Sequence, residues 1–212
     1  MNGFFSPPGF FTRNETLVAL VILGFSCIAT VSDPNFLSIT TVSDILRASI
    51  VLGILAVAAM LVLISGGIDV SFTAVAVSAM YMTTTFTLAY WPEMPWPLIF
   101  LLSICIGGLL GAINGIFIAW LKLPTLIVTL GTLSVFRGFL LTFVGSQRIS
   151  ALPPDMRGFS RLMVARGTTE GGSFYALPLA FVALIFVILL TWFLLNHTVL
   201  GRSIYALGGS VE

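Results

Sequence analysis

Residues 45–64 read ILRASIVLGILAVAAMLVLI, and the polar segment SGGIDVS follows at residues 65–71. An α-helix needs about 20 apolar residues to cross the hydrocarbon core of a bilayer, and the first stretch meets that length. Lipid offers no water to backbone N–H and C=O groups, so a spanning segment must satisfy them internally as a helix. The stretch therefore predicts a transmembrane helix that ends at a pair of glycines.

The composition of the whole chain agrees with a membrane location. Its 212 residues are 58% hydrophobic and 8% charged, and the mean hydropathy is +1.12. A soluble domain carries about 25% charged residues, so this chain has too few to cover a surface that faces water. The formal net charge of +1 gives no reason to expect a nucleic-acid partner. The lipid bilayer is the expected surrounding.

Other apolar stretches along the chain raise the number of candidate spans to about six. They cover residues 16–31, 45–64, 70–90, 97–120, 125–144 and 175–195. The alternating pattern of a transmembrane β-barrel does not occur in them. The expected fold class is all-α: a polytopic transmembrane helical protein with residues 1–212 in a single transmembrane domain.

The distribution of basic residues predicts a cytoplasmic N-terminus. In that orientation Arg13, Lys122 and Arg202 lie on the inner side, and the short outer loops carry no Lys or Arg, as the positive-inside rule requires. The one long link, residues 145–174, becomes an extracytoplasmic loop. Long links obey the rule weakly, so the arginines of this link do not overturn the assignment. These arginines are Arg148, Arg157, Arg161 and Arg166.

The chain lacks the residues that several kinds of catalytic and binding site require. The single lysine, Lys122, follows a leucine, so the chain has no Gly-Lys-Ser/Thr phosphate loop. His197 is the single histidine, which excludes a paired-histidine zinc site. The spans hold no pair of carboxylates for acid–base catalysis. We expect no catalytic residue, no metal site and no cofactor, and the chain cannot be its own ATPase.

A ridge of small residues lies in the span at residues 97–120. Gly107, Gly111 and Gly115 recur every four residues, which places them on one helix face and predicts close packing against a neighbouring helix. Asn114 lies beside the ridge, and its amide needs an interhelical partner or a wet cavity. It can serve as structural glue or contact a ligand directly, and the sequence leaves both readings open.

Arg137 is the ionisable residue that lies deepest in a predicted span. It is about twelve residues into the stretch 125–144, and a charge at the bilayer centre costs about 2.5–3.5 kcal/mol even on the insertion scale. We therefore expect a buried charge that faces an internal cavity, or a span that is tilted or broken. Arg137, Asn114 and Asp69 are the candidates for a translocation path.

The segment 65–71 also has two readings. Gly66 and Gly67 unwind a helix easily, and Asp69 with Ser71 can cap the first amides of the next helix. The segment is then a tight capped turn. Alternatively, it is a broken helix that exposes polar backbone to a solute path, as in transporters.

The last residues, 200–212, are too short for another span. They mix Arg202, Tyr205 and several glycines. They form either a free tail or a short helix on the cytoplasmic face that engages a partner.

Three ordered segments together resemble one family. ISGGIDVS at residues 64–71 resembles the "GGIDLSVG" signature of the ribose/xylose/galactose-type permeases of ABC importers. AING at 112–115, LPTLIVTLGTL at 123–133 and Arg137-Gly138 are similar to the family's "ING…IPPFIATLGTL…RG" stretch. GRSIYALGG at 201–209 looks like its "GRxIYAIGGN" segment.

This resemblance implies the transmembrane subunit of a binding-protein-dependent importer in the bacterial inner membrane, which moves a monosaccharide by alternating access. The implied partners are a cytoplasmic ATPase subunit, an extracytoplasmic sugar-binding protein and a second permease copy. Residues 200–212 would be the cytoplasmic coupling segment that docks on the ATPase. The residues implied in this coupling are Gly201, Arg202, Tyr205, Ala206, Gly208 and Gly209.

The chain departs from the family pattern at two points. Phe72 stands where the family has a small residue, and family members continue for about four more spans beyond the last motif. The chain is therefore expected to represent the N-terminal part of a longer pattern. Two alternatives stay open: a permease for another polar solute such as amino acids, and a structural or regulatory membrane subunit that transports nothing.

Overall fold

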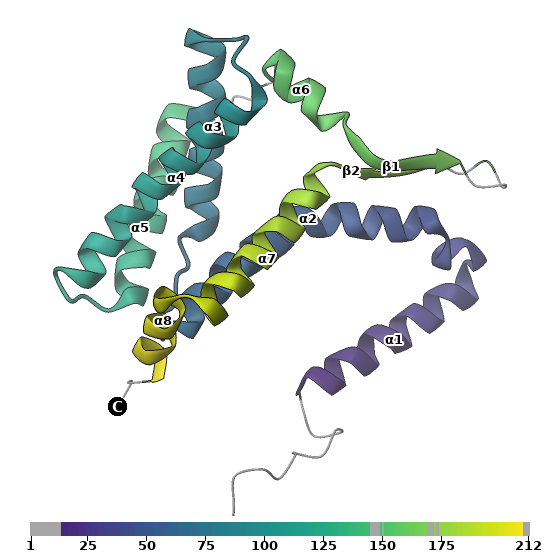
Figure 1. Cartoon of the computed structure of the whole chain (residues 1–212), viewed down its shortest axis with the longest axis horizontal. Helices are drawn as coiled ribbons and strands as arrows, with labels where there is room; N and C mark the ends of the chain where they lie inside the picture. Colours follow the sequence, from purple (N-terminus) through teal and green to yellow (C-terminus); the bar gives the residue numbers. More distant parts are fainter. Residues whose placement is uncertain (1–13, 145–148, 150, 169–171, 173, 210–212) are drawn as a thin grey trace, which may run out of the picture. The chain divides into compact units, whose positions relative to one another are not determined.

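The computed structural model describes residues 14–144, 149, 151–168, 172 and 174–209. Helices dominate the described part (Figure 1). The chain divides into two compact units: residues 1–45 with 166–176, and residues 46–165 with 177–212. Each unit is described by itself.

The smaller unit contains helix α1 (Asn14–Ser32) and a 3₁₀ turn (Pro34–Leu37). Helix α2 (Ile39–Ile64) begins in this unit and extends into the larger one. The hydroxyl of Ser38 accepts the Thr41 N–H at 3.3 Å, so it caps the first turn of α2. The sequence placed the start of this helix at residue 45, which was six residues too late, because the capping serine was not recognised.

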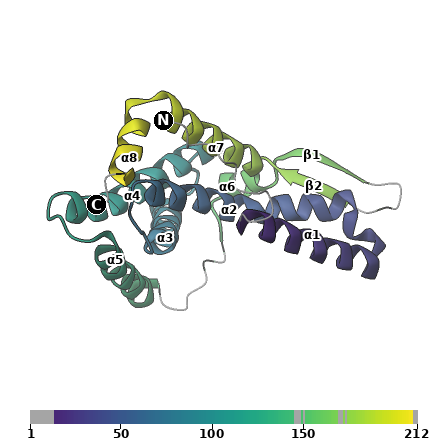
Figure 2. The same cartoon turned by 90° about the horizontal axis from the view of Figure 1, so that it is seen from below.

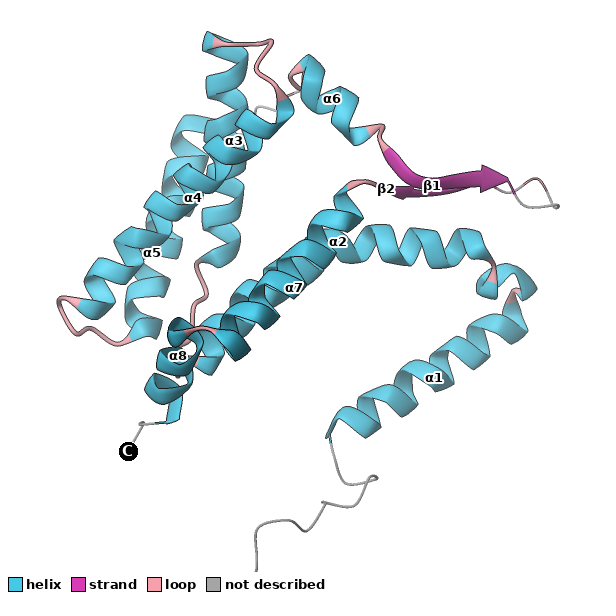
Figure 3. Cartoon of the chain, viewed as in Figure 1, coloured by secondary structure: helices cyan, strands magenta, loops and turns pink. Residues whose placement is uncertain are grey.

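The larger unit holds most of the helices, and Figure 3 separates them from the strands and loops. They are α3 (Phe72–Tyr90), α4 (Trp96–Ala119), α5 (Thr125–Phe139), which continues into a π turn (Leu140–Val144), α6 (Pro154–Ser160), α7 (Ala180–His197) and α8 (Val199–Gly209). Strands β1 (Met163–Thr168) and β2 (Phe174–Pro178) pair in a two-stranded sheet. The predicted loop 145–174 therefore contains a helix and a strand among its described residues, while Arg148 lies outside them.

Five helices in the described part are long and apolar enough to cross a membrane. They confirm the all-α polytopic class, while the first predicted span is a shorter apolar helix, Thr16–Ser32. The last span begins at Ala180 rather than at Tyr175, because Tyr175 belongs to β2. An added Cβ on Gly167 of β1 would lie 2.6 Å from the Tyr175 hydroxyl oxygen. The tyrosine therefore covers a glycine on the neighbouring strand, as in aromatic rescue.

Helices α3, α4 and α5 pack together in the larger unit (Figure 2). The buried residues of α3 are small or hydroxylated: Ala74, Ser78, Ala79, Thr83, Thr84 and Thr87. A Cβ on Gly107 of α4 would lie 3.8 Å from the Ala79 Cβ. Close approach through small residues is the packing mode of membrane helices, where burial of apolar surface gives little driving force.

Helix α6 is fixed to the start of α4. The Trp96 N–H donates to the Asp155 carboxylate at 2.6 Å, so an acidic group meets the positive end of the α4 dipole. The ring of Phe159 packs on the ring of Trp96 with centroids 4.8 Å apart. In the larger unit α6 thus lies at one end of the helices, whereas α8 lies at the other (Figure 1).

The turn between α4 and α5 contains a lysine in the left-handed region. Lys122 has φ 52°, a conformation that costs a side-chain-bearing residue about 1–2 kcal/mol in a helix. The Leu123 N–H bonds back to the Phe117 carbonyl, as at a helix C-terminus where glycine is the usual residue. Lys122 therefore stores backbone strain in this turn.

We predict that Lys122→Gly stabilises the chain relative to Lys122→Ala by up to about 1 kcal/mol. Both variants remove the lysine side chain, so their difference isolates the left-handed backbone. Unfolding of the purified protein in detergent micelles, followed by circular dichroism during denaturant titration, measures this difference. Equal stability of the two variants would contradict the assigned strain.

Candidate functional site

The segment between α2 and α3, residues 65–71, is not helical, and its polar groups are gathered around one carboxylate. Asp69 Oδ1 accepts the Ser71 N–H and the Ser71 hydroxyl, each at 2.7 Å. The Ser71 side chain makes no capping bond to α3. The predicted cap is therefore wrong for Ser71, whose hydroxyl bonds to Asp69 and not to the first amides of α3.

Asn114 of α4 extends this arrangement into a chain of three residues. Its Nδ2 donates to Ser71 Oγ at 2.8 Å. Because the Ser71 hydroxyl gives its hydrogen to Asp69, it can only accept from Asn114, which fixes the orientation of the amide. Ser71 is fully buried and Asn114 is 6% exposed. The structure thus brings together Asp69 and Asn114, two of the three path candidates.

The other end of the Asn114 amide is an open acceptor. Within the described residues, its Oδ1 is buried and has no hydrogen-bond partner. A buried acceptor left unsatisfied costs about 1–3 kcal/mol. The position therefore favours a donor from a water, a solute hydroxyl or another helix.

Helix α5 holds the backbone of the same segment. Thr125 Oγ1 accepts the Ile68 N–H at 3.2 Å. Thr129 Oγ1 accepts the Val70 N–H at 3.4 Å and donates to the Ile68 carbonyl at 3.2 Å. These two hydroxyls take the place of the helical partners that the segment lacks. We call Asp69, Ser71, Asn114, Thr125 and Thr129 the break cluster.

Close approach makes the glycines of the segment necessary. Gly66 has φ 79°, which glycine adopts without strain. A Cβ on Gly67 would lie 3.2 Å from Thr125 Cγ2, so a larger residue would require the Thr125 side chain to shift by a few tenths of an ångström. Both glycines were predicted from the sequence, whereas Thr125 and Thr129 were not. Their spacing of four residues at the start of a helix was the available signal.

Helix α8 divides the predicted coupling residues between two surfaces. Gly201 and Gly208 are seven residues apart, which places them on one face. A Cβ on Gly201 would overlap the Leu195 carbonyl oxygen, and one on Gly208 would overlap the Ile64 carbonyl oxygen. The remaining coupling residues are exposed: Arg202, Tyr205, Ala206 and Gly209. Residues 201–209 are thus a helix rather than a free tail, while residues 210–212 lie outside the described part.

Arg137 and part of the glycine ridge do not lie where the sequence indicated. Arg137 is exposed, so the expected burial of its charge was wrong. It lies three residues before the π turn at Leu140, and the helix continues through that turn as one candidate span, Thr125–Phe143. It also lies about 12 Å along α5 from Thr129 at 1.5 Å per residue, outside the break cluster. Of the ridge, only Gly107 meets a neighbour, and an added Cβ on Gly111 or Gly115 would meet nothing within 4 Å in the described residues.

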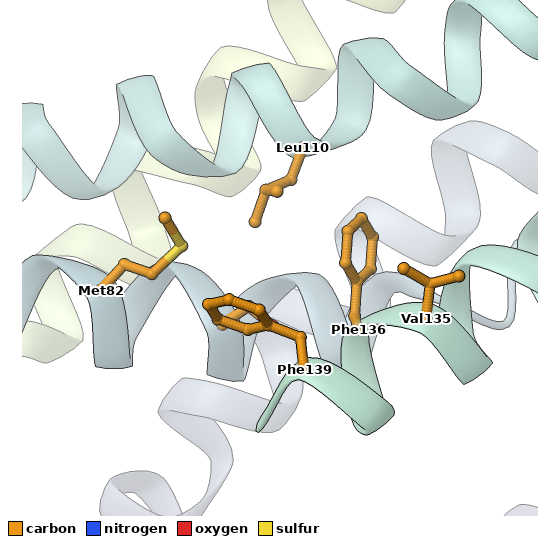
Figure 4. A pocket seen from close by; sticks show the side chains of 6 residues that line it. Met82, Leu110, Val135, Phe136 and Phe139 are labelled. Atoms are coloured by element: carbon orange, nitrogen blue, oxygen red, sulfur yellow. The ribbon is translucent and has the colours of Figure 1, made fainter. Parts of the chain in front are cut away.

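A cavity of about 180 Å³ lies between α3, α4 and α5, away from the break cluster (Figure 4). It is lined by Ser78, Met82, Leu110, Val135, Phe136 and Phe139. Its side chains are almost entirely apolar, so they offer little to a polar solute. The polar chemistry of the larger unit is gathered in the break cluster instead.

Five apolar helices of the described part that are long enough to cross a membrane define this chain as a polytopic membrane protein. Residues 41–212 match the family described as branched-chain amino acid transport system / permease component. The chain belongs to this family of bacterial inner-membrane permeases.

Two curated relatives of the chain are permease proteins of an import system. The chain is 30% identical over 205 residues to the autoinducer 2 import system permease protein LsrC of Yersinia pseudotuberculosis serotype O:1b (strain IP 31758), covering 94% of this chain and 53% of that protein. It is 32% identical over 201 residues to LsrC of Enterobacter sp. (strain 638), covering 94% and 54%. The chain thus spans about half the length of these relatives. No solved structure matches it.

We predict that Thr129→Val destabilises the chain by about 1–2 kcal/mol, because it leaves the Val70 N–H and the Ile68 carbonyl without their hydroxyl partner. Thr132→Val is the matched control, since the Thr132 hydroxyl bonds only to carbonyls of its own helix, Val128 and Thr129. Denaturant titration in micelles measures stability, and hydrogen exchange reports on the Val70 amide. If both variants lose the same stability, α5 does not hold the segment through Thr129.

Proposed function

We propose that this chain is part of the transmembrane subunit of an ATP-binding-cassette importer that moves a small polar solute by alternating access. The observation that carries the proposal is the family match over residues 41–212, which includes both the break cluster and α8. The chain is a transport subunit rather than an enzyme, and a separate partner hydrolyses ATP. The relatives' name, an import system permease, supports this over a subunit that transports nothing.

Helix α8 is the proposed docking element for the cytoplasmic ATPase. Its inner face meets backbone carbonyls through Gly201 and Gly208, while Arg202 and Tyr205 are exposed. Exposed Arg and Tyr are enriched among the residues that dominate protein interfaces. The helix therefore offers a rigid, accessible surface at the end of the bundle where the N-inside orientation predicts cytoplasm.

The opposite end of the larger unit carries α6, which we propose to face the extracytoplasmic solute-binding protein. Arg157 of α6 and Arg161 directly after the helix are exposed, and the position of α6 on α4 is fixed through Asp155. The separation of α6 from α8 supports opposite sides of the membrane for residues 145–174 and 200–212. A second permease copy completes the proposed assembly, as the resemblance implies.

A monosaccharide is the proposed solute. The break cluster offers hydroxyl and amide groups, an open acceptor on Asn114 and one carboxylate on Asp69, which suit a neutral molecule rich in hydroxyl groups. We assign Asn114 and Asp69 to the translocation path, and Arg137 to a separate point of it along α5. An amino acid is the second candidate, favoured by the description of the family, but the cluster contains no cation to pair with a carboxylate.

The transport proposal is tested with the complete transporter in proteoliposomes that contain ATP. We expect uptake of a labelled monosaccharide that requires both the ATPase and the solute-binding protein. Leucine is the competing solute, and leucine uptake without sugar uptake would replace the proposed substrate. Absence of ATP-dependent uptake of either solute would reject the transport role.

We predict that Arg202→Asp weakens binding of the ATPase subunit by at least about tenfold, because it reverses an exposed charge at the proposed interface. Replacing Gly201-Arg202 by Ala-Asp should uncouple ATP hydrolysis from uptake, since the alanine would also collide with the Leu195 carbonyl. Arg157→Asp makes the same charge reversal on α6 and should leave ATPase binding unchanged. Co-purification and titration of ATPase onto nanodiscs measure the affinities, and equal effects of Arg202→Asp and Arg157→Asp would reject α8 as the docking site.

A further inference from the structure

Gly208 brings the backbone of α8 into direct contact with the end of α2. A Cβ on Gly208 would overlap the carbonyl oxygen of Ile64 and would lie 3.0 Å from its carbonyl carbon and 3.3 Å from the Gly66 nitrogen. The Cα–H that replaces the side chain therefore faces the Ile64 carbonyl, as in the weak Cα–H···O contacts of closely packed helices. The three described atoms nearest to such a Cβ are all backbone atoms of Ile64 and Gly66.

The contact falls where α2 loses its regular hydrogen bonding. The Gly66 N–H bonds to the Leu63 carbonyl at 3.0 Å, and the Gly67 N–H bonds to the Val62 carbonyl at 3.1 Å. With Gly66 in the left-handed region, these two bonds form a Schellman cap at the end of α2. The Ile68 N–H, which would bond to Ile64 in a continuous helix, donates to Thr125 instead. Gly208 thus touches the carbonyl that marks the boundary between helix and break cluster.

The other end of α8 is also held against backbone. Thr198 Oγ1 accepts the Gly201 N–H at 3.2 Å, and Gly201 has no room for a side chain beside the Leu195 carbonyl. This leaves α8 little freedom to slide along the end of α7. A displacement of α8 by a partner bound to its exposed face therefore also displaces the backbone at Ile64.

We infer that Gly208 is a positioning residue that links α8 to the break cluster, so that a movement of α8 changes the hydrogen bonding of residues 65–71. The inference rests on the proposed docking of an ATPase on α8. It goes beyond that docking because it names the route by which the ATPase reaches the solute path. Residues 64–71 and 201–209 are far apart in the sequence but then move together. We call this mechanical link between α8 and the break cluster the joint.

The test compares Gly208→Ala with Gly209→Ala. Both variants add one methyl group to the last turn of α8, but a Cβ on Gly209 meets nothing within 4 Å. In hydrogen exchange of the chain in nanodiscs, the Ile68, Val70 and Ser71 amides should exchange at least about fivefold faster in Gly208→Ala than in the unchanged chain. A factor of about five is the smallest typical coupling between two sites of a protein. Gly209→Ala should exchange like the unchanged chain. Equal exchange in the two variants would overturn the joint.

A second readout uses the assembled transporter. In Gly208→Ala, the ratio of hydrolysis stimulated by the loaded solute-binding protein to basal hydrolysis should fall at least about fivefold relative to the unchanged transporter. A role that is merely structural would lower assembly and basal hydrolysis together. Unchanged stimulation, despite faster exchange at residues 65–71, would overturn the part of Gly208 in coupling.

A third measurement uses the unchanged transporter, so it tests the inference even if the Gly208→Ala variant fails to insert into the membrane. Docking of the ATPase on the unchanged transporter should alter exchange both in α8 and in residues 65–71, while α6 stays unchanged. A change confined to α8 would overturn the joint. If the transporter shows no ATP-driven uptake at all, the proposed function falls, and the comparison of Gly208→Ala with Gly209→Ala still decides whether Gly208 links the two elements.

Discussion

The structure depends on the need to satisfy backbone polar groups where a helix stops inside a membrane protein. Between Ile64 and Phe72 the chain has no helical ladder, and lipid supplies no replacement donors or acceptors. The hydroxyls of Thr125 and Thr129 supply them from α5. The position of α5 beside the segment follows from this requirement, and so does the close approach of Thr125 to Gly67.

The fold class could be predicted from the sequence, because length and hydropathy decide which stretches can cross a bilayer. The predicted function came from the three segments that resemble the permease family. The expected ends of three spans differ by no more than two residues from α3, α4 and α5 with its π turn. Tyr175 was assigned to a helix because an apolar strand and the start of an apolar helix look alike in composition. Pairing with β1, the strand just before it in the chain, decided the strand.

The candidate site was only partly predictable for a related reason. Asp69 and Asn114 are conspicuous because polar residues are rare in spans, whereas Thr125 and Thr129 are ordinary helix residues until a partner segment is placed beside them. Arg137 drew attention by its depth in a predicted span, but depth does not reveal the direction of a side chain. Gly111 and Gly115 repeat the spacing of Gly107, yet only the tertiary arrangement shows which of the three meets a neighbour.

The hydroxylated buried face of α3 has a consequence for the order of membrane insertion during synthesis. Helix α3 is the least hydrophobic of the five candidate spans and the one with the largest buried share. Its Ser78, Thr83 and Thr87 would gain nothing from an early, solitary exit into lipid. We therefore expect the translocation machinery to retain α3 until α4 emerges, so that both enter the bilayer as a preassembled hairpin.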